Sequence, residues 1–280
     1  MPTPLEQYLE KHRRELQLKE LAILREIDRI CRQHDIVYWL DGGTLLGAVR
    51  HGGFIPWDDD IDVGLPRPDY NRFVQIAKSY LPDHMDIKTM TSDPNYKCYF
   101  TRLINNKKKI YWDHGQYTAV IGVWMDVFPL DGLPKNPLLR KLQVFRVKLN
   151  KALYKFTQID YVSTNRTNRP FSERVLIRFA QLTRIGRLMD GDKRLQKLDR
   201  ALQRYDYDAS AYAWNFSGCY GKREIVPHIQ LGGSRTAEFE GMQVSIPEAA
   251  EDYLTSIYGD YMKLPPEDQR RSHEVRFAEE

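Results

Sequence analysis

The chain has 280 residues, of which 42% are hydrophobic, enough to form the core of one domain or of one domain with a large insertion. Its three cysteines, Cys31, Cys98 and Cys219, lie far apart without a Cys-x-x-Cys pair, which argues against a disulfide scaffold or a zinc ribbon. The sequence contains no apolar run of about 18 residues and no N-terminal signal peptide, so we expect a cytoplasmic protein.

The net charge of +4 is unevenly distributed along the chain. Residues 140–204 contain 17 Lys or Arg against 5 Asp or Glu, a local excess of +12 that leaves about −8 for the rest. A basic block of this kind indicates an anionic partner, such as a membrane surface, a lipid pyrophosphate or a nucleic acid. A solvated helical face is the alternative interpretation.

The spacing of apolar residues predicts the elements of the N-terminal half. Leu and Ile recur at helical intervals over residues 5–34, and residues 36–40 form a short apolar run typical of a strand. Gly42 and Gly43 predict a turn, followed by a short helix over residues 44–51 that a second glycine pair ends. The other elements expected in this half are a helix over 70–79 and strands over 85–89, 96–105, 110–112 and 120–128.

The acidic run DDDID, residues 58–62, is expected to lie on a strand. Because side chains two residues apart on a strand point the same way, Asp60 and Asp62 would present two carboxylates side by side. Such like charges repel unless a cation lies between them, and hard oxygen ligands suit Mg²⁺ or Mn²⁺. Asp58 has the same phase and could support the metal, whereas Asp59 should point to the other side. A solvated acidic turn is the alternative.

Two further features complete the expected site. A glycine turn at a helix N-terminus binds phosphate through backbone N–H groups, which predicts that Gly42, Gly43 and Thr44 hold a phosphate chain. A third carboxylate is expected from Asp126, a single acid inside the apolar run GVWMDVFPLDG, because a charge in such a run is rarely buried without a partner. Asp131 is the competing candidate, but Asp131-Gly132 is typical of a turn. Asp126 could instead face water at a strand end.

The first part of the C-terminal half is expected to be largely helical. A basic helical region over residues 136–205 is interrupted by the loop NRTNRP, residues 165–170. Ser172 is the predicted N-cap of a helix over residues 173–189, which has an apolar stripe and surrounding arginines. This composition is typical of a helix lying at a membrane interface, unless the stripe packs on the rest of the protein. The remaining expected elements are a hairpin over residues 238–247 that returns to the catalytic sheet and a last helix over 248–258.

Two segments resemble the signature of the LicD family, with a distant similarity to fukutin-related protein. They are GGTLLGAVRHGGFIPWDDDID, residues 42–62, and YLTSIYGDYMKLPP, residues 253–266. The resemblance spans roughly residues 20 to 275. It implies an α+β fold with a nucleotidyltransferase-like mixed sheet flanked by helices. Residues 1–135 and 206–280 would form the catalytic domain, with the basic helical insertion 136–205 facing the acceptor or the membrane.

The resemblance also implies an activity, namely metal-dependent transfer of phosphocholine from CDP-choline to a sugar hydroxyl. The acceptor would be a cell-surface glycan, a teichoic acid precursor or another lipid-linked saccharide, reached by peripheral contact with the inner membrane face. Asp60, Asp62 and Asp126 would be both catalytic residues and ligands of Mg²⁺ or Mn²⁺, and no nucleic acid partner is expected. The alternatives are transfer of ethanolamine, glycerol or ribitol headgroups, or a true nucleotidyltransferase.

The remaining candidates would contact the substrate, and each could equally be an ordinary surface or core residue. Arg50 ends the short helix near the phosphate turn, and Lys97 and Arg102 could reach the diphosphate of the donor. The family pattern also points to His273. A quaternary ammonium cannot donate a hydrogen bond, so a choline pocket would use aromatic faces. The aromatic candidates near the motifs are Trp57, Tyr99, Trp112 and Tyr117.

Overall fold

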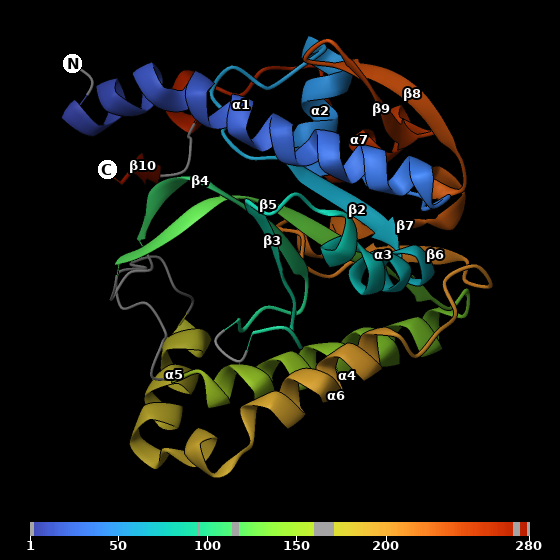
Figure 1. Cartoon of the computed structure of the whole chain (residues 1–280). Helices are drawn as coiled ribbons and strands as arrows, with labels where there is room; N and C mark the ends of the chain where they lie inside the picture. Colours follow the sequence, from blue (N-terminus) through green and yellow to red (C-terminus); the bar gives the residue numbers. More distant parts are fainter. Residues whose placement is uncertain (1–2, 94–95, 114–117, 160–170, 271–274, 279–280) are drawn as a thin grey trace.

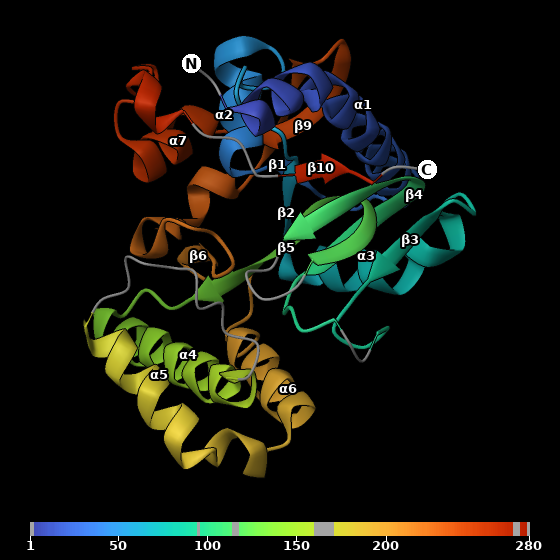
Figure 2. The same cartoon turned by 90° about the vertical axis from the view of Figure 1, so that its left-hand side faces the viewer.

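The computed structural model describes residues 3–93, 96–113, 118–159, 171–270 and 275–278. A curled mixed sheet lies at the centre, with α1, α2 and α7 on one side (Figures 1 and 2). Helices α4, α5 and α6 form a separate layer beyond the other side. The two motifs, residues 42–62 and 253–266, and the basic region therefore fold into different parts of the molecule.

The elements follow one another along the chain as a mixture of helices and strands. The helices are α1 (Pro4–Gln33), α2 (Gly42–His51), α3 (Arg67–Tyr80), α4 (Pro137–Thr157), α5 (Phe171–Thr183), α6 (Gly191–Leu202) and α7 (Ala250–Tyr258). The strands are β1 (Trp39–Leu40), β2 (Asp62–Pro66), β3 (Met85–Lys88), β4 (Thr101–Asp113), β5 (Thr118–Leu133), β6 (Tyr212–Asn215), β7 (Ile225–Pro227), β8 (Ser234–Phe239), β9 (Met242–Pro247) and β10 (Val275–Phe277). Short 3-10 helices are η2 (Ile185–Leu188), η3 (Gly221–Glu224), η4 (His228–Leu231) and η5 (Glu267–Gln269).

Strand β5 is the centre of the sheet because three other strands pair with it. Strand β2 runs parallel to β5, while β4 and β6 are antiparallel to it. The main path is β1-β2-β5-β4-β10, with β3 paired to β4 and β7 paired to β6. This confirms the predicted α+β class with a mixed sheet flanked by helices.

The apolar stripe of α1 forms much of the core on one side of the sheet. Ile23, Leu24, Ile27 and Ile30 are completely buried, as their helical spacing predicts. A second, smaller cluster lies under the helical layer, where Leu198 of α6 is among the fully buried residues. This cluster also contains Leu133 of β5 and Trp214 of β6, so α4 and α6 pack against the main sheet at that end.

Several predicted boundaries in the N-terminal half are corrected. The predicted strand 36–40 shortens to β1, because only two of its residues pair with β2. The acidic run does not lie on a strand: residues 58–61 are irregular, and β2 begins only at Asp62. The predicted strands 96–105 and 110–112 are replaced by one long strand, β4, which begins only at Thr101 and has an irregularity in its pairing to β5 between Asn105 and Lys109.

Three predictions for the C-terminal half also change. The hairpin β8–β9 forms a two-stranded sheet of its own instead of returning to the main sheet. The helix predicted over residues 173–189 begins at Phe171 and ends at Thr183, and Arg184 adopts a left-handed φ of 51° before η2. Ser172 therefore lies inside the first turn and is not the N-cap. The loop NRTNRP lies outside the described residues.

Asp131 does not lie in a turn but inside β5, where its side chain is 2% exposed. Arg67 Nε and Nη2 donate to its two carboxylate oxygens over 2.7 and 2.8 Å, and Arg67 Nη1 contacts Asp199 of α6 at 3.2 Å. Each oxygen of Asp131 thus has a charged donor, in the bidentate geometry that guanidinium groups favour. The role of Asp131 is to join α3 and β5, and it no longer competes with Asp126 for the candidate site.

Candidate active site

Three neighbouring strands bring a row of charged side chains together. Asp62 at the start of β2 is in register with Asp126 of β5, which is in turn in register with Arg102 of β4. Residues opposite one another on adjacent strands project to the same face of the sheet. Arg102 Nε and Nη2 donate to the two oxygens of Asp126 over 2.7 and 2.9 Å. The sequence prediction that Asp62 and Asp126 lie together is confirmed, and Arg102 contacts Asp126.

The electrostatics of Asp62 reflect this crowding. Loss of hydration raises its pKa well above the ordinary value, and the nearby carboxylates of Asp60, Asp126, Asp41 and Asp58 raise it further. The ionised form of Asp62 is therefore costly without a compensating positive charge. This is the electrostatic situation in which a bound cation stabilises a carboxylate cluster.

The aspartates of the acidic run differ in how deeply they are buried. Asp59 is buried, whereas Asp58 and Asp60 are partly exposed. The Asp58 carboxylate lies close to Gly43: a side chain at Gly43 would place its Cβ 2.7 Å from Asp58 Oδ2. Gly43 is thus needed for close approach, and a carboxylate lies at the N-terminus of α2.

The N-terminus of α2 is held by side chains as well as by its glycines. Asp41 is the N-cap, and its Oδ1 accepts the N–H of Gly42, whose φ of +52° is a left-handed value that favours glycine. Thr44 is buried, and its Oγ1 accepts the N–H of Asp62 over 2.9 Å. The Thr44 hydroxyl therefore fixes the position of Asp62 as well as lying in the predicted phosphate turn.

Asp41 belongs to a buried polar cluster that the sequence does not predict. Tyr253 Oη in α7 donates to Asp41 Oδ1, and Asn215 Nδ2 at the end of β6 donates to Oδ2, both over 2.6 Å. Burial and the charge of Asp41 raise the pKa of Glu224 to about 8. Tyr253 also explains why the second motif belongs to the site, because it connects that motif directly to the residue before Gly42.

Glu20 of α1 is another acid directed at the site from outside both motifs. Its side chain is buried, and Oε2 has no hydrogen-bond partner. Burial raises the pKa of Glu20 well above its usual value, and Asp60, Asp59, Asp62 and Asp58 add to the rise. A signal for Glu20 does exist in the sequence, since it shares the apolar stripe of α1 with Leu24, four residues later.

The other predicted substrate residues lie in separate surroundings. Arg50 is at the opposite end of α2 from the phosphate turn and donates to the Tyr261 carbonyl over 2.7 Å. Lys97 faces the helical layer, with an ion pair to Asp192 of α6 at 3.2 Å. Trp57 is partly buried beneath the guanidinium of Arg270, 4.8 Å from the ring centroid. Trp112 lies in β4, whereas Tyr117 and His273 lie outside the described residues.

The predicted metal ligands Asp60, Asp62 and Asp126 interact electrostatically without forming a preformed coordination shell. Within the described part of the chain, no three His, Cys, Asp or Glu side chains are arranged so that they could hold a metal ion. The bidentate contact with Arg102 engages both oxygens of Asp126. The chemistry of Asp60 and Asp62 nevertheless fits Mg²⁺ or Mn²⁺, because both prefer carboxylate oxygens and would relieve the repulsion at Asp62.

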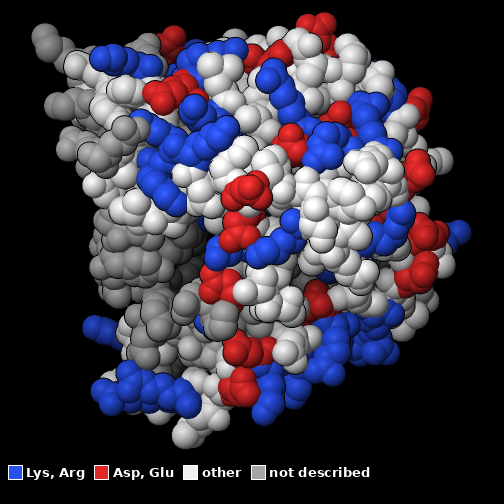
Figure 3. Space-filling model, viewed as in Figure 1, with Lys and Arg blue, Asp and Glu red and all other residues white. Residues whose placement is uncertain are grey.

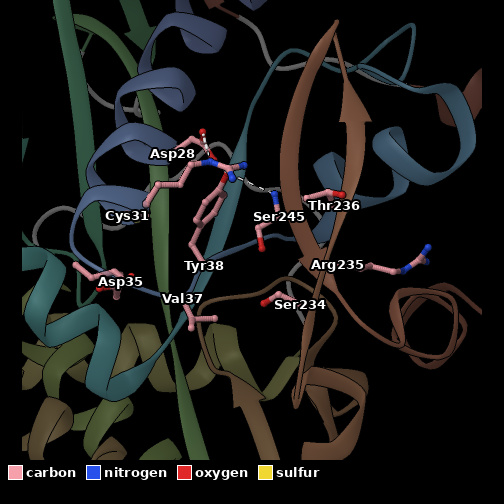
Figure 4. Close-up of a pocket in the computed structure, with 11 residues that line it drawn as sticks. Asp28, Cys31, Asp35, Val37, Tyr38, Ser234, Arg235, Thr236 and Ser245 are labelled. Carbon is pink, nitrogen blue, oxygen red and sulfur yellow. Dashed lines mark hydrogen bonds and ion pairs between the residues drawn. The ribbon is translucent and has the colours of Figure 1, made fainter.

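A cavity of about 580 Å³ lies elsewhere, between α1, residues 35–38 that follow it, and the β8–β9 hairpin (Figure 4). Asp28, Arg32 and Tyr38 line it, and they satisfy one another: Tyr38 Oη and Arg32 Nε each donate to the Asp28 carboxylate, over 2.6 and 2.8 Å. None of the predicted site residues lines this cavity. The candidate active site is therefore the acidic row beside the N-terminus of α2.

Comparison with known proteins agrees with this choice. Residues 35–136 match a family described as LicD/FKTN/FKRP, nucleotidyltransferase domain. Over 276 residues the chain is 29% identical to the lipopolysaccharide cholinephosphotransferase LicD of Haemophilus influenzae, covering 95% of this chain and 97% of that protein. A stretch of 60 residues, 20% of this chain, is 43% identical to 12% of the ribitol 5-phosphate transferase FKRP of Homo sapiens. The match to residues 35–136 includes the N-terminus of α2, Asp62 and Asp126.

Proposed function

We propose, from the premise that this chain is a phosphotransferase with a LicD-family domain, that it transfers phosphocholine from CDP-choline to a sugar hydroxyl. The acceptor would be a cell-surface glycan or a teichoic acid precursor, and the reaction would take place in the cytoplasm. The observation that carries the proposal is the pairing of Asp62 with Asp126 beside the N-terminus of α2. Similarity to a cholinephosphotransferase over 95% of the chain supports the headgroup. We also infer a nucleotidyltransferase-like arrangement for the sheet.

Each group in the site has a proposed task. The acceptor hydroxyl oxygen forms a bond to the phosphorus of phosphocholine, the bond from that phosphorus to the CMP oxygen breaks, and CMP leaves with the electron pair. Asp126 would accept the hydroxyl proton, with Arg102 fixing its orientation. Asp60 and Asp62, together with Asp126, would hold Mg²⁺ or Mn²⁺. The metal would neutralise charge on the diphosphate when bound.

The α2 N-terminus would hold the phosphate oxygens of the donor. The N–H of Gly42 is already donated to Asp41, so the phosphate contacts would fall on the N–H groups of Gly43 and Thr44. The Asp58 carboxylate lies against Gly43, and an incoming phosphate would displace it. This exchange of one anion for another is favourable only if the diphosphate charge is compensated, which is the task assigned to the cation.

Product analysis tests this proposal. Incubation with CDP-choline, Mg²⁺ and a saccharide acceptor should release CMP and label the acceptor with phosphocholine, whereas a nucleotidyltransferase would release pyrophosphate from a nucleoside triphosphate. Thermal unfolding with CDP-choline, CDP-ethanolamine, CDP-glycerol and CDP-ribitol would identify the donor, because a ligand at 100 times its Kd adds about 2.7 kcal/mol to the free energy of unfolding. In a parallel incubation with CTP in place of CDP-choline, pyrophosphate production, together with no CMP release from CDP-choline, would contradict the proposal.

One contact favours a cationic headgroup over ribitol. The Lys151 ammonium lies 4.4 Å from the ring centroid of Phe216 and 5.3 Å from that of Tyr99, and the two rings are 5.4 Å apart. Burial lowers the pKa of Lys151 to about 8. Phe216 directly follows Asn215, which donates to Asp41 at the α2 N-terminus. We propose that these two aromatic rings recognise the quaternary ammonium of choline and that Lys151 contacts them when no donor is bound.

If aromatic rings recognise the choline cation, the protein should prefer CDP-choline to an uncharged analogue. CDP-choline should bind more tightly than the neutral analogue in which a tert-butyl group replaces the trimethylammonium, by about 2- to 30-fold, since such contacts contribute about 0.5–2 kcal/mol. Phe216→Leu should reduce this ratio, while Phe179→Leu in α5 should leave it unchanged. Calorimetric titration of both nucleotides into the three proteins measures the ratio. Equal affinities of the wild-type protein for the two nucleotides would exclude the aromatic recognition but not the transfer reaction.

A further inference from the structure

Helix α4 exposes a row of large apolar side chains to solvent. Leu138, Leu142, Phe145 and Leu149 are 76%, 51%, 64% and 46% exposed. Their spacing of four, three and four residues places them on one line along the helix. The buried side of α4, which includes Val147, is on the opposite face. The apolar row is therefore not part of the core of this chain.

Helix α5 carries a second row of exposed apolar side chains. It lies beside α4 in both views of the molecule (Figures 1 and 2). Val175, Phe179 and Leu182 follow the same four-and-three spacing and are 50%, 54% and 83% exposed, and Leu188 of η2 is 87% exposed. Monomeric proteins rarely expose large apolar side chains in such continuous rows, so this surface indicates a partner.

The charge of the surface identifies the kind of partner. Helix α4 contains six Lys or Arg residues and no Asp or Glu over its 21 residues. Lys141, Lys148 and Lys155 are exposed and recur every seven residues, which places them along one flank of the apolar row. Lys and Arg side chains gather along the lower edge of the molecule in Figure 3, where Figure 1 shows α4, α5 and α6. An apolar row with a cationic flank complements an anionic lipid surface.

We propose that the α4–α5 surface, defined by the apolar rows 138–149 and 175–182 and the lysines 141, 148 and 155, lies on an anionic lipid bilayer. Among the described residues, no helix is long and apolar enough to cross a membrane, so the contact is with one leaflet. A second copy of the chain is a poorer occupant, because self-association through this surface would bring the same lysine row of both copies together. The surface would hold the acidic row of the main sheet near a lipid-linked acceptor.

Co-sedimentation of the full chain with vesicles tests the proposal. We expect binding to vesicles of phosphatidylglycerol and phosphatidylcholine that weakens as salt rises, and little binding to phosphatidylcholine alone. Lys141→Gln, Lys148→Gln and Lys155→Gln combined should weaken binding about 100-fold, since each charge near an anionic surface contributes about fivefold. A matched control, Lys11→Gln, Lys107→Gln and Lys263→Gln, removes the same charge from exposed sites outside this surface and should bind with nearly wild-type affinity.

A second variant separates insertion from charge attraction. Leu142→Ser with Phe145→Ser should lose vesicle binding even at low salt, while transfer to a soluble saccharide acceptor and thermal unfolding stay near wild type. Equal recovery in the supernatant with and without phosphatidylglycerol would overturn the proposal. So would a dimer, seen by sedimentation equilibrium, that dissociates in the Leu142→Ser/Phe145→Ser variant, because the apolar rows would then be a subunit interface. Either result leaves the transfer reaction itself untouched.

Discussion

Asp62→Asn should lower the turnover of phosphocholine transfer by about 10²–10³-fold, the loss typical of removing one preorganised electrostatic group at a reacting centre. Asp62 pairs with Asp126 across β2 and β5, and its backbone N–H is fixed by Thr44, so the Asn side chain should occupy the same position. The measurement is steady-state turnover with CDP-choline at saturating Mg²⁺. An Asp62→Asn enzyme with more than about a tenth of wild-type turnover would contradict the assignment.

The same substitution should not destabilise the metal-free protein. The raised pKa of Asp62 means that its contribution to the free energy of unfolding is fully present below the ordinary pKa and is lost as the pH rises through the folded-state pKa. At neutral pH the neutral Asn side chain removes this penalty, so the melting temperature should stay equal or rise. Asp208→Asn, at an exposed site, is the control and should change neither turnover nor the pH dependence. A marked drop in melting temperature for Asp62→Asn would indicate a structural role.

Local patterns predicted the helices well, and long-range packing explains the corrections. The apolar stripe of α1 and the glycine pair that ends α2 act within a few residues, so the sequence alone is sufficient for them. The extents of β4 and β5 depend on which strand each pairs with, information that no local pattern contains. Asp131-Gly132 has the composition of a turn, yet Arg67 from α3 makes burial of Asp131 in β5 favourable. The tertiary partner overrides the local preference.

In the candidate site, too, local patterns predicted some residues and long-range packing determines the others. Asp126 was predicted as the companion of Asp62 because a single acid in an apolar run needs a partner, and the register of β2 and β5 places the two together. The partner with which Asp126 makes direct hydrogen bonds is Arg102, and the sequence gives no sign of that pairing. Asp41 and Glu224 were missed because they lie far apart in the chain and only folding brings Asp41 together with Tyr253 of α7 and with Glu224 of η3. Glu20 alone among the missed acids has a local signal, its position on an apolar stripe.

The pairing of Arg102 with Asp126 leads to the second large effect, which a double-mutant cycle measures. Asp126→Asn should lower kcat by about 10²–10³-fold and weaken donor binding far less, because its proposed work is on the acceptor side of the site, where it would take the hydroxyl proton. It should also lower the free energy of unfolding by about 3–5 kcal/mol, since it leaves the buried Arg102 without its charged partner. The variant Arg102→Met keeps the Asp126 carboxylate but removes the guanidinium that orients it. Its turnover therefore measures how much the activity depends on the orientation of Asp126.

The double variant, Arg102→Met with Asp126→Asn, separates catalysis from stability. Removing both charges avoids a buried guanidinium that has lost its carboxylate partner, so the double variant should be more stable than Asp126→Asn alone. Its turnover should nevertheless remain as low as that of Asp126→Asn, because the carboxylate that we propose as the proton acceptor is absent from both variants. If turnover recovers together with stability, Asp126 only partners Arg102, and the proton acceptor must be sought among the other acids around the α2 N-terminus, with Glu224 and its pKa of about 8 as the first to test.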